Sequence, residues 1–196
     1  MTKKPAEVLL FNMPFVSLAR PAIGVSLLKA KLQSEGVGCE VAYANLQLAE
    51  EIGMDTYRLV DDQIGLTYFV GDWLFAQDLL SGTPDREAYL DGVRSRVRTE
   101  EEYRRILAIE QRIPEFLDSL LERYRVGDRA FVGFSSTFQQ NLASLALAKR
   151  IKQRYPHIPI AFGGANCEGR MGQTLHEQFP WVDYVFDGES DESFPT

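Results

Sequence analysis

The sequence contains few of the residues on which metal sites and disulfide frameworks depend. Only two cysteines and two histidines occur among its 196 residues. Cys39 begins a predicted strand and Cys167 follows a pair of glycines, so we expect two free thiols rather than a disulfide or a metal cluster. His157 and His176 have no cysteine, histidine or carboxylate partner at metal-ligand spacing. We therefore expect both histidines to be structural or exposed.

Long apolar runs and an excess of positive charge are also absent. No window approaches the ~20 apolar residues that a membrane-spanning helix needs, and the apolar run before Pro14 is too short for a signal peptide. These features predict a cytoplasmic protein with no membrane partner. The net charge is −7, and lysine and arginine alternate with acidic residues along the chain, so nucleic acid is a poor partner.

Two glycine-rich phosphate-binding signatures are missing. The first predicted strand is not followed by GxGxxG, and the chain has no GxxxxGK[ST] segment. Interpretations that require NAD or ATP therefore lose their main support. A phospho-acceptor receiver domain would need an acidic pair after the first strand and an aspartate ending the third, and neither is present.

Short apolar runs alternate with helical segments along most of the chain. A helix is predicted after Pro21, with Ile23, Leu27, Leu28 and Leu32 on its apolar face, and others from Phe138 to Tyr155 and from Met171 to Phe179. This alternation predicts an α/β fold: a doubly wound, Rossmann-like or flavodoxin-like, five-stranded parallel sheet with helices on both faces. The predicted strands are Val8 to Phe11, Cys39 to Ala44, Ala130 to Phe134, Ile158 to Phe162 and Val182 to Phe186.

Residues 46–127 interrupt this alternation, because one crossover helix needs only about 10 to 15 residues. We interpret them as a helical insertion between strands 2 and 3 of a single domain spanning residues 1–196. Pro114 predicts either a kink in one helix or a break between two. An aromatic patch in the first half is expected to be a small core that packs the insertion onto the sheet, rather than a binding surface. It consists of Tyr68, Phe69, Trp73 and Phe75.

Small and polar residues gather after the predicted strands. In an open parallel sheet, ligands bind outside the carboxyl ends of the strands. Small residues let a bulky ligand approach the backbone, and hydroxyl groups offer hydrogen bonds. A tight turn or a helix N-cap explains each segment separately, but their joint placement predicts a ligand site. Its segments are Asn12, Met13, Pro14 and Phe15, then Ser135, Ser136 and Thr137, then Gly163, Gly164, Ala165 and Asn166, and finally Gly188 and Glu189.

Three longer segments resemble one known family. GFSSTFQQNLASLALAKRIK (133–152), FGGANCEGRMG (162–172) and VDYVFDGESDESFP (182–195) are similar to the N-terminal half of the radical S-adenosylmethionine (SAM) C-methyltransferases that mature ribosomally made peptides. NMPF after the first strand and GDWLFA (71–76) match the same family. The resemblance covers nearly the whole chain, including the insertion.

This resemblance implies a cobalamin-binding domain. In the intact enzyme a radical SAM barrel would follow, holding a [4Fe-4S] cluster and S-adenosylmethionine, and the chain's end soon after the fifth strand suggests such a continuation. With two cysteines, the present chain is not expected to hold the cluster or to be active alone. Its partners would be its own C-terminal radical SAM domain and a precursor peptide. The cofactor would be lined by Met13 to Phe15, Ser135 to Gln139, Gly163 to Asn166 and Gly188 to Glu189, with Gly163 and Gly164 making room for the nucleotide tail.

One departure from better-known cobalamin domains concerns the cobalt ligand. Those domains carry DxHxxG after the first strand, whereas this loop reads PFVSLARP and has no histidine. We therefore expect base-off cobalamin without a protein nitrogen on its lower face, which leaves water, an empty position or shielding by a side chain such as Phe15. Two alternatives remain open: a peptide or subunit interaction module without cobalamin, and a small-molecule sensor using the same cleft.

Overall fold

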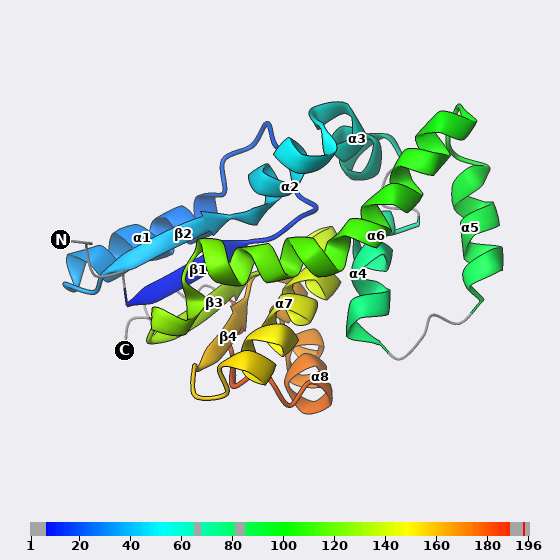
Figure 1. Cartoon of the computed structure of the whole chain (residues 1–196). Helices are drawn as coiled ribbons and strands as arrows, with labels where there is room; N and C mark the ends of the chain where they lie inside the picture. Colours follow the sequence, from blue (N-terminus) through cyan, green and yellow to red (C-terminus); the bar gives the residue numbers. More distant parts are fainter. Residues whose placement is uncertain (1–6, 65–67, 81–84, 189–193, 195–196) are drawn as a thin grey trace.

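The computed structural model describes residues 7–64, 68–80, 85–188 and 194, and within them five strands form one parallel sheet. The spatial order is β2-β1-β3-β4-β5 (Figure 1). The order reverses between β1 and β3, which is the switch point of a flavodoxin-like doubly wound sheet. The predicted fold class is confirmed. The strands are β1 (Val8–Asn12), β2 (Cys39–Tyr43), β3 (Phe131–Ser135), β4 (Ile160–Gly163) and β5 (Tyr184–Val185).

The last strand is shorter than the sequence predicted. β5 contains two residues, which pair with Ala161 and Phe162 of β4. Just before it, the Asp183 carboxylate accepts a hydrogen bond from the Ile160 amide at 2.6 Å. A side chain thus takes the place that a strand carbonyl would occupy in the ladder, and regular pairing begins only after Asp183.

Helices cover the two faces of the sheet unequally. The helix α1 (Ile23–Ser34) packs through Val25 and Leu32 against Val8, Leu10 and Cys39 of β1 and β2. The opposite face is covered by α7 (Asn141–Arg154) and by helices of the insertion (Figure 1). The helix α8 (Arg170–Gln178) connects β4 with β5. Of the described helices, α1 alone packs in the smaller apolar cluster on its face.

The insertion connects β2 to β3 in the sequence, and its helices form a layer on one face of the sheet. Its longest helix, α6, starts at Thr99 with a capping box, in which the Glu102 amide donates to Thr99 Oγ1 at 3.1 Å. This helix continues through Pro114, so the predicted alternative of a break between two helices is wrong; Figure 1 shows its two halves at an angle, as a proline kink produces. The elements are α2 (Ala44–Ile52), α3 (Met54–Arg58), the π-helical turn η1 (Leu59–Gln63), α4 (Val70–Leu79), α5 (Arg86–Arg94), α6 (Glu100–Arg123) and the 3₁₀ turn η2 (Val126–Asp128).

The aromatic patch of the insertion is a packed core. Trp73 and Phe75 are buried, and the Trp73 ring stacks on Tyr89 of α5 with 4.8 Å between centroids. The Tyr89 hydroxyl donates to the Tyr68 carbonyl at 2.7 Å, whereas Phe69 stays half exposed. Most of the patch is therefore packed rather than exposed, as expected, but it belongs to the main apolar core and not to a separate small one. None of the helices within the described ranges has the length and hydropathy to cross a membrane.

Candidate functional site

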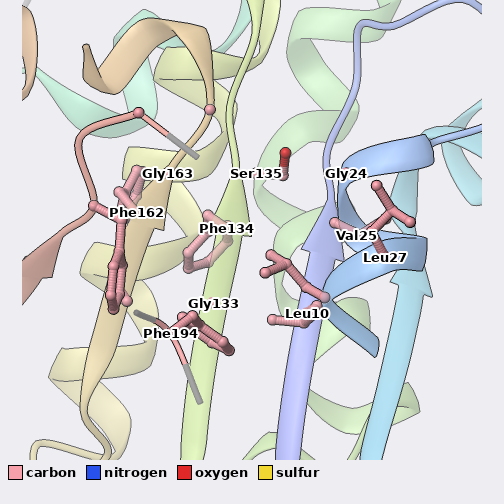
Figure 2. A pocket seen from close by; sticks show the side chains of 15 residues that line it. Leu10, Gly24, Val25, Leu27, Gly133, Phe134, Ser135, Phe162, Gly163 and Phe194 are labelled. Carbon is pink, nitrogen blue, oxygen red and sulfur yellow. The ribbon is translucent and has the colours of Figure 1, made fainter. Parts of the chain in front are cut away.

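A cavity of about 330 Å³ opens on the α1 face of the sheet (Figure 2). It lies between α1 and the strands β3 and β4, and it runs from the middle of the sheet to the strand carboxyl ends. Leu10, Gly133 and Ala161 are neighbours in strand register and form its floor. Gly163 and Gly164 line it at the strand ends. The cavity thus reaches the switch point at which doubly wound sheets bind ligands.

Small residues keep the cavity hollow. A Cβ atom on Gly133 would lie 2.7 Å from Leu10 Cδ2, so a side chain at this position would displace the leucine. On α1, a Cβ atom on Gly24 would lie 3.7 Å from Ser135 Oγ, in van der Waals contact, so a longer side chain there would extend into the space between helix and strand. On the far side, the Phe194 ring packs edge-on against Phe131 and Phe186.

The walls of the cavity are mainly apolar. Figure 2 shows the Ser135 hydroxyl at the upper end of the cavity, where it has no hydrogen-bond partner among the described residues. Leu27 extends from α1 and is 59% exposed. None of the residues found to line the cavity is titratable. An apolar or aromatic group with few polar atoms suits this site, and the walls themselves offer no acid or base.

Four of the predicted site residues line the cavity. Ser135 contributes from β3, Gly163 and Gly164 from the end of β4, and Gly188 from the segment after β5. Glu189, predicted beside them, lies outside the described residues. The convergence of these strand ends follows from the parallel sheet, as the sequence analysis expected.

The loop after β1 does not line the cavity, contrary to our expectation. Met13, Pro14 and Phe15 are buried on the side of the insertion. The Phe15 ring lies 4.8 Å from the Tyr57 ring, between centroids. A Cβ atom on Gly71 of α4 would lie 2.9 Å from Phe15 Cδ2, so insertion and loop are in close contact. Phe15 is therefore not placed to shield a ligand in this cavity, so this option among the three falls away.

Ser136 and Gln139 also face inward. Gln139 is 1% exposed, and its Oε1 accepts a hydrogen bond from the Gly71 amide at 2.8 Å. Ser136 is fully buried, and its Oγ accepts from Asn166 Nδ2 at 3.0 Å. Thr137 forms a capping box with Gln140 at the start of the 3₁₀ turn η3 (Phe138–Gln140). These predicted residues shape the strand-end loops instead of lining the cavity.

Gly164 has a structural requirement of its own. Its φ is +93°, and a Cβ atom there would lie 2.6 Å from the Ser136 carbonyl oxygen. The Ser136 amide donates to the Gly163 carbonyl at 2.8 Å, and the Asn166 amide donates to the Ser136 carbonyl at 3.2 Å. The loops after β3 and β4 are thus joined by backbone contacts that exclude a side chain at Gly164.

A buried polar network supports the strand ends and was not predicted. Asn12 Nδ2 donates to Asn45 Oδ1 at 3.0 Å, and Gln140 Nε2 donates to Asn12 Oδ1 at 3.1 Å. Gln140 Nε2 also donates to the Met13 carbonyl. Asparagine directly after the apolar run of β1 was a weak signal of this role, because buried polar groups need partners.

Several titratable groups, at and away from the strand ends, have structural roles. Asp72 of α4 accepts a hydrogen bond from the Leu142 amide at 2.8 Å at the start of α7, and desolvation raises its pKa to about 6. Burial raises the pKa of Cys39 to about 11 and that of Cys167 to about 12, so neither thiol is a nucleophile near neutral pH. His176 Nδ1 lies 3.0 Å from the Val182 carbonyl. Among the described residues no three His, Cys, Asp or Glu side chains gather as metal ligands.

No protein-family model, curated protein or solved structure matches this chain. Function must therefore be argued from the cavity. The geometry favours binding of a ligand with a compact apolar part, anchored by backbone groups and one hydroxyl at the strand ends.

Proposed function

We propose that this chain is a cobalamin-binding domain whose cavity receives the nucleotide tail of the cofactor. The observation that carries the proposal is the apolar cavity between α1 and β3–β4, which opens at the strand ends beside Gly163, Gly164 and Gly188. The resemblance of the segments around Ser135 and Gly163 to radical SAM C-methyltransferases supports it. We further propose that the intact protein is a cytoplasmic enzyme that methylates carbon centres of a ribosomally made peptide.

The residues of the cavity fit the tail. Its aromatic base is flat and has few polar atoms, and a volume of about 330 Å³ falls within the range of about 300 to 1,000 Å³ typical of small-molecule sites. Gly24 and Gly133 provide depth, and the Ser135 hydroxyl can donate or accept a hydrogen bond. At the mouth, Gly188 has φ +74° and open space around its α-carbon.

The cavity walls do not provide a ligand for cobalt. Both histidines lie within the described residues. His157 precedes β4, at the amino ends of the strands and so away from the cavity mouth, and His176 contacts Val182. We therefore propose base-off binding without a protein nitrogen. Bound cobalamin would supply a cobalt that carries the methyl group, while this chain holds and orients it. We expect the electron paramagnetic resonance spectrum of the cob(II)alamin complex to lack nitrogen superhyperfine splitting; splitting would contradict this part of the proposal.

The iron–sulfur cluster, S-adenosylmethionine and peptide belong, in this proposal, to the radical SAM domain of the intact enzyme. The alternative function, an interaction module that recognises a leader peptide through the insertion, loses one of its supports. Trp73 and Phe75, which would have offered an aromatic recognition surface, are buried in the core of the insertion.

The decisive experiment compares two corrins that differ in the tail. The purified chain is titrated with hydroxocobalamin and with cobinamide, which lacks the nucleotide, and bound corrin is measured by absorbance after desalting. We expect cobalamin to bind at least about tenfold more tightly, because only cobalamin can bury its base in the cavity.

Two variants of α1 make the test specific. Gly24→Leu fills the space beside Ser135 and should abolish the preference for cobalamin. Ala30→Leu introduces the same leucine side chain at an exposed position of α1 outside the cavity and should preserve the preference. Equal binding of the two corrins by the unmodified chain, or no binding of either, would refute the proposal.

A further inference from the structure

Phe138 is an exposed aromatic residue at the strand ends. It is 64% exposed, the highest value among the large apolar residues of the described part of the chain. It begins η3, three residues after Ser135. Its carbonyl accepts a hydrogen bond at 3.0 Å from Nδ2 of Asn166, a residue of the loop that follows β4. Phe138 therefore lies at the ends of β3 and β4, beside the mouth of the cavity.

The backbone of Phe138 adopts a conformation that phenylalanine rarely takes. Its φ is +46°, in the left-handed region, and a bulky residue there costs folding free energy. Its neighbours hold it in place from both sides. Thr137 and Gln140 close a capping box around it, and Gln139 is tied to the Gly71 amide. The loop is thus firmly fixed while it presents an apolar ring to solvent.

Packing within the described chain does not offset the left-handed backbone of Phe138 or the exposure of its ring. Phe138 belongs to neither apolar cluster, and among the described residues its ring contacts no other aromatic ring. A glycine would allow the same backbone without strain, and a polar side chain would avoid the exposed ring. Stability of the described chain therefore does not explain phenylalanine at this position.

We propose that the Phe138 ring packs against the corrin ring of cobalamin, on the face from which the nucleotide tail leaves. This inference rests on the proposed function. If the tail enters the cavity beside Ser135 and Gly163, the corrin must lie over the strand ends with that face toward the protein. Phe138 is exposed at these strand ends, and a flat macrocycle and an aromatic ring gain from face or edge contact. Phe138 also takes the place expected of Phe15, which is buried under the insertion.

The test uses Phe138→Gly in the whole chain, with cobalamin and cobinamide as probes. Glycine relieves the strain at φ +46°, so we expect thermal stability to be unchanged or higher. Affinity for both corrins should fall by about threefold to tenfold, because both contain the macrocycle. Phe138→Trp keeps a flat ring and should retain the affinity.

Control variants separate strain from contact. Arg125→Gly relieves the same kind of left-handed strain, φ +48°, before the amino end of β3 and so away from the strand carboxyl ends. Leu80→Ala removes another exposed apolar side chain, at the end of α4. Neither should change corrin affinity.

The outcomes distinguish this inference from the proposed function. If the unmodified chain prefers cobalamin and Gly24→Leu abolishes the preference, but Phe138→Gly binds both corrins as tightly as before, only this inference is overturned; Phe138 would then be a contact for another protein surface. A loss of stability in Phe138→Gly that accompanies the loss of affinity would assign the residue a structural role and would also overturn it. Failure of the unmodified chain to bind either corrin would overturn both.

Discussion

Two glycines with positive φ, one at the candidate site and one after α1, differ in what they do for the fold. Gly164 combines φ +93° with backbone contact to Ser136, whereas Gly36, at the end of α1, has φ +82° and open space around it. Alanine at Gly36 should meet only the cost of the left-handed backbone, about 1 kcal/mol. Alanine at Gly164 must also displace the Ser136 carbonyl, so we expect a loss larger by roughly 1–3 kcal/mol. Urea unfolding of both variants measures the difference, and equal losses would contradict the close contact.

Asp72 should make stability depend on pH. Desolvation raises its pKa from 3.8 to about 6 in the folded state, so between these values the folded chain binds more protons than the unfolded chain. This contribution is present below about pH 4 and is lost as pH rises through about 6. Asp72→Asn keeps an oxygen acceptor for the Leu142 amide but cannot ionise.

We therefore expect Asp72→Asn to gain stability relative to the unmodified chain as pH rises from 4 to 7. Urea unfolding at several pH values measures this difference. Asp91→Asn, which replaces an exposed carboxylate of α5, serves as the control and should show a smaller change. A pH-independent difference between Asp72→Asn and the unmodified chain would show that the carboxyl group is not desolvated.

At the scale of elements, the sequence predicted both ends of every strand within one or two residues, because each strand is a short apolar run bounded by turn residues. It could not separate the two roles of α1. Ile23 and Leu27 have the spacing of a core face, yet they are 63% and 59% exposed and Leu27 lines the cavity. A helical period identifies an apolar face without showing whether the protein core or a ligand will cover it.

The same limit explains the errors at the candidate site. Ser135 and Gly163 were predicted because they follow strands, and so was Phe15, which follows β1 in the same way. The structure separates them because the insertion covers Phe15 through Tyr57 and Gly71, whereas Ser135 and Gly163 line the cavity on the α1 face of the sheet. A contact between residues so far apart in sequence leaves no local pattern. The sequence also did not predict Gly24 as a cavity residue, because a single glycine in a helical segment does not indicate a particular role.

Ion pairs join the insertion to α7, and they should differ in how much they contribute to the free energy of unfolding. Arg150 pairs with Asp78 of α4 and with Asp118 of α6, and the Asp78 side chain is only 13% exposed. Arg150→Met would leave that carboxylate without its partner, so we expect a loss of about 1–3 kcal/mol. Arg154 pairs with Glu122 of α6, and both side chains are more than half exposed. Arg154→Met should cost less than about 1 kcal/mol. Thermal unfolding compares the two, and similar losses would contradict this ranking.

For the whole molecule, the uneven cover of the sheet relates binding to stability. Parallel sheets are ordinarily covered on both faces, but in the described residues the α1 face over β3 and β4 is occupied by a cavity and the Phe194 ring. A ligand in this cavity completes the cover, and it binds only where α1 and both strands are in place. Binding must therefore stabilise the folded chain as a unit.

We expect cobalamin to raise the free energy of unfolding by about 1.4 kcal/mol for each tenfold increase in ligand above its dissociation constant. The dependence of that free energy on urea concentration should keep its slope, because the surface exposed on unfolding hardly changes. Cobinamide should begin to stabilise only at higher concentration, and Gly24→Leu should bring the two curves together. Stabilisation that is equal for both corrins in the unmodified chain would place the nucleotide tail outside the cavity, because the tail would then contribute nothing to the stability of the folded state.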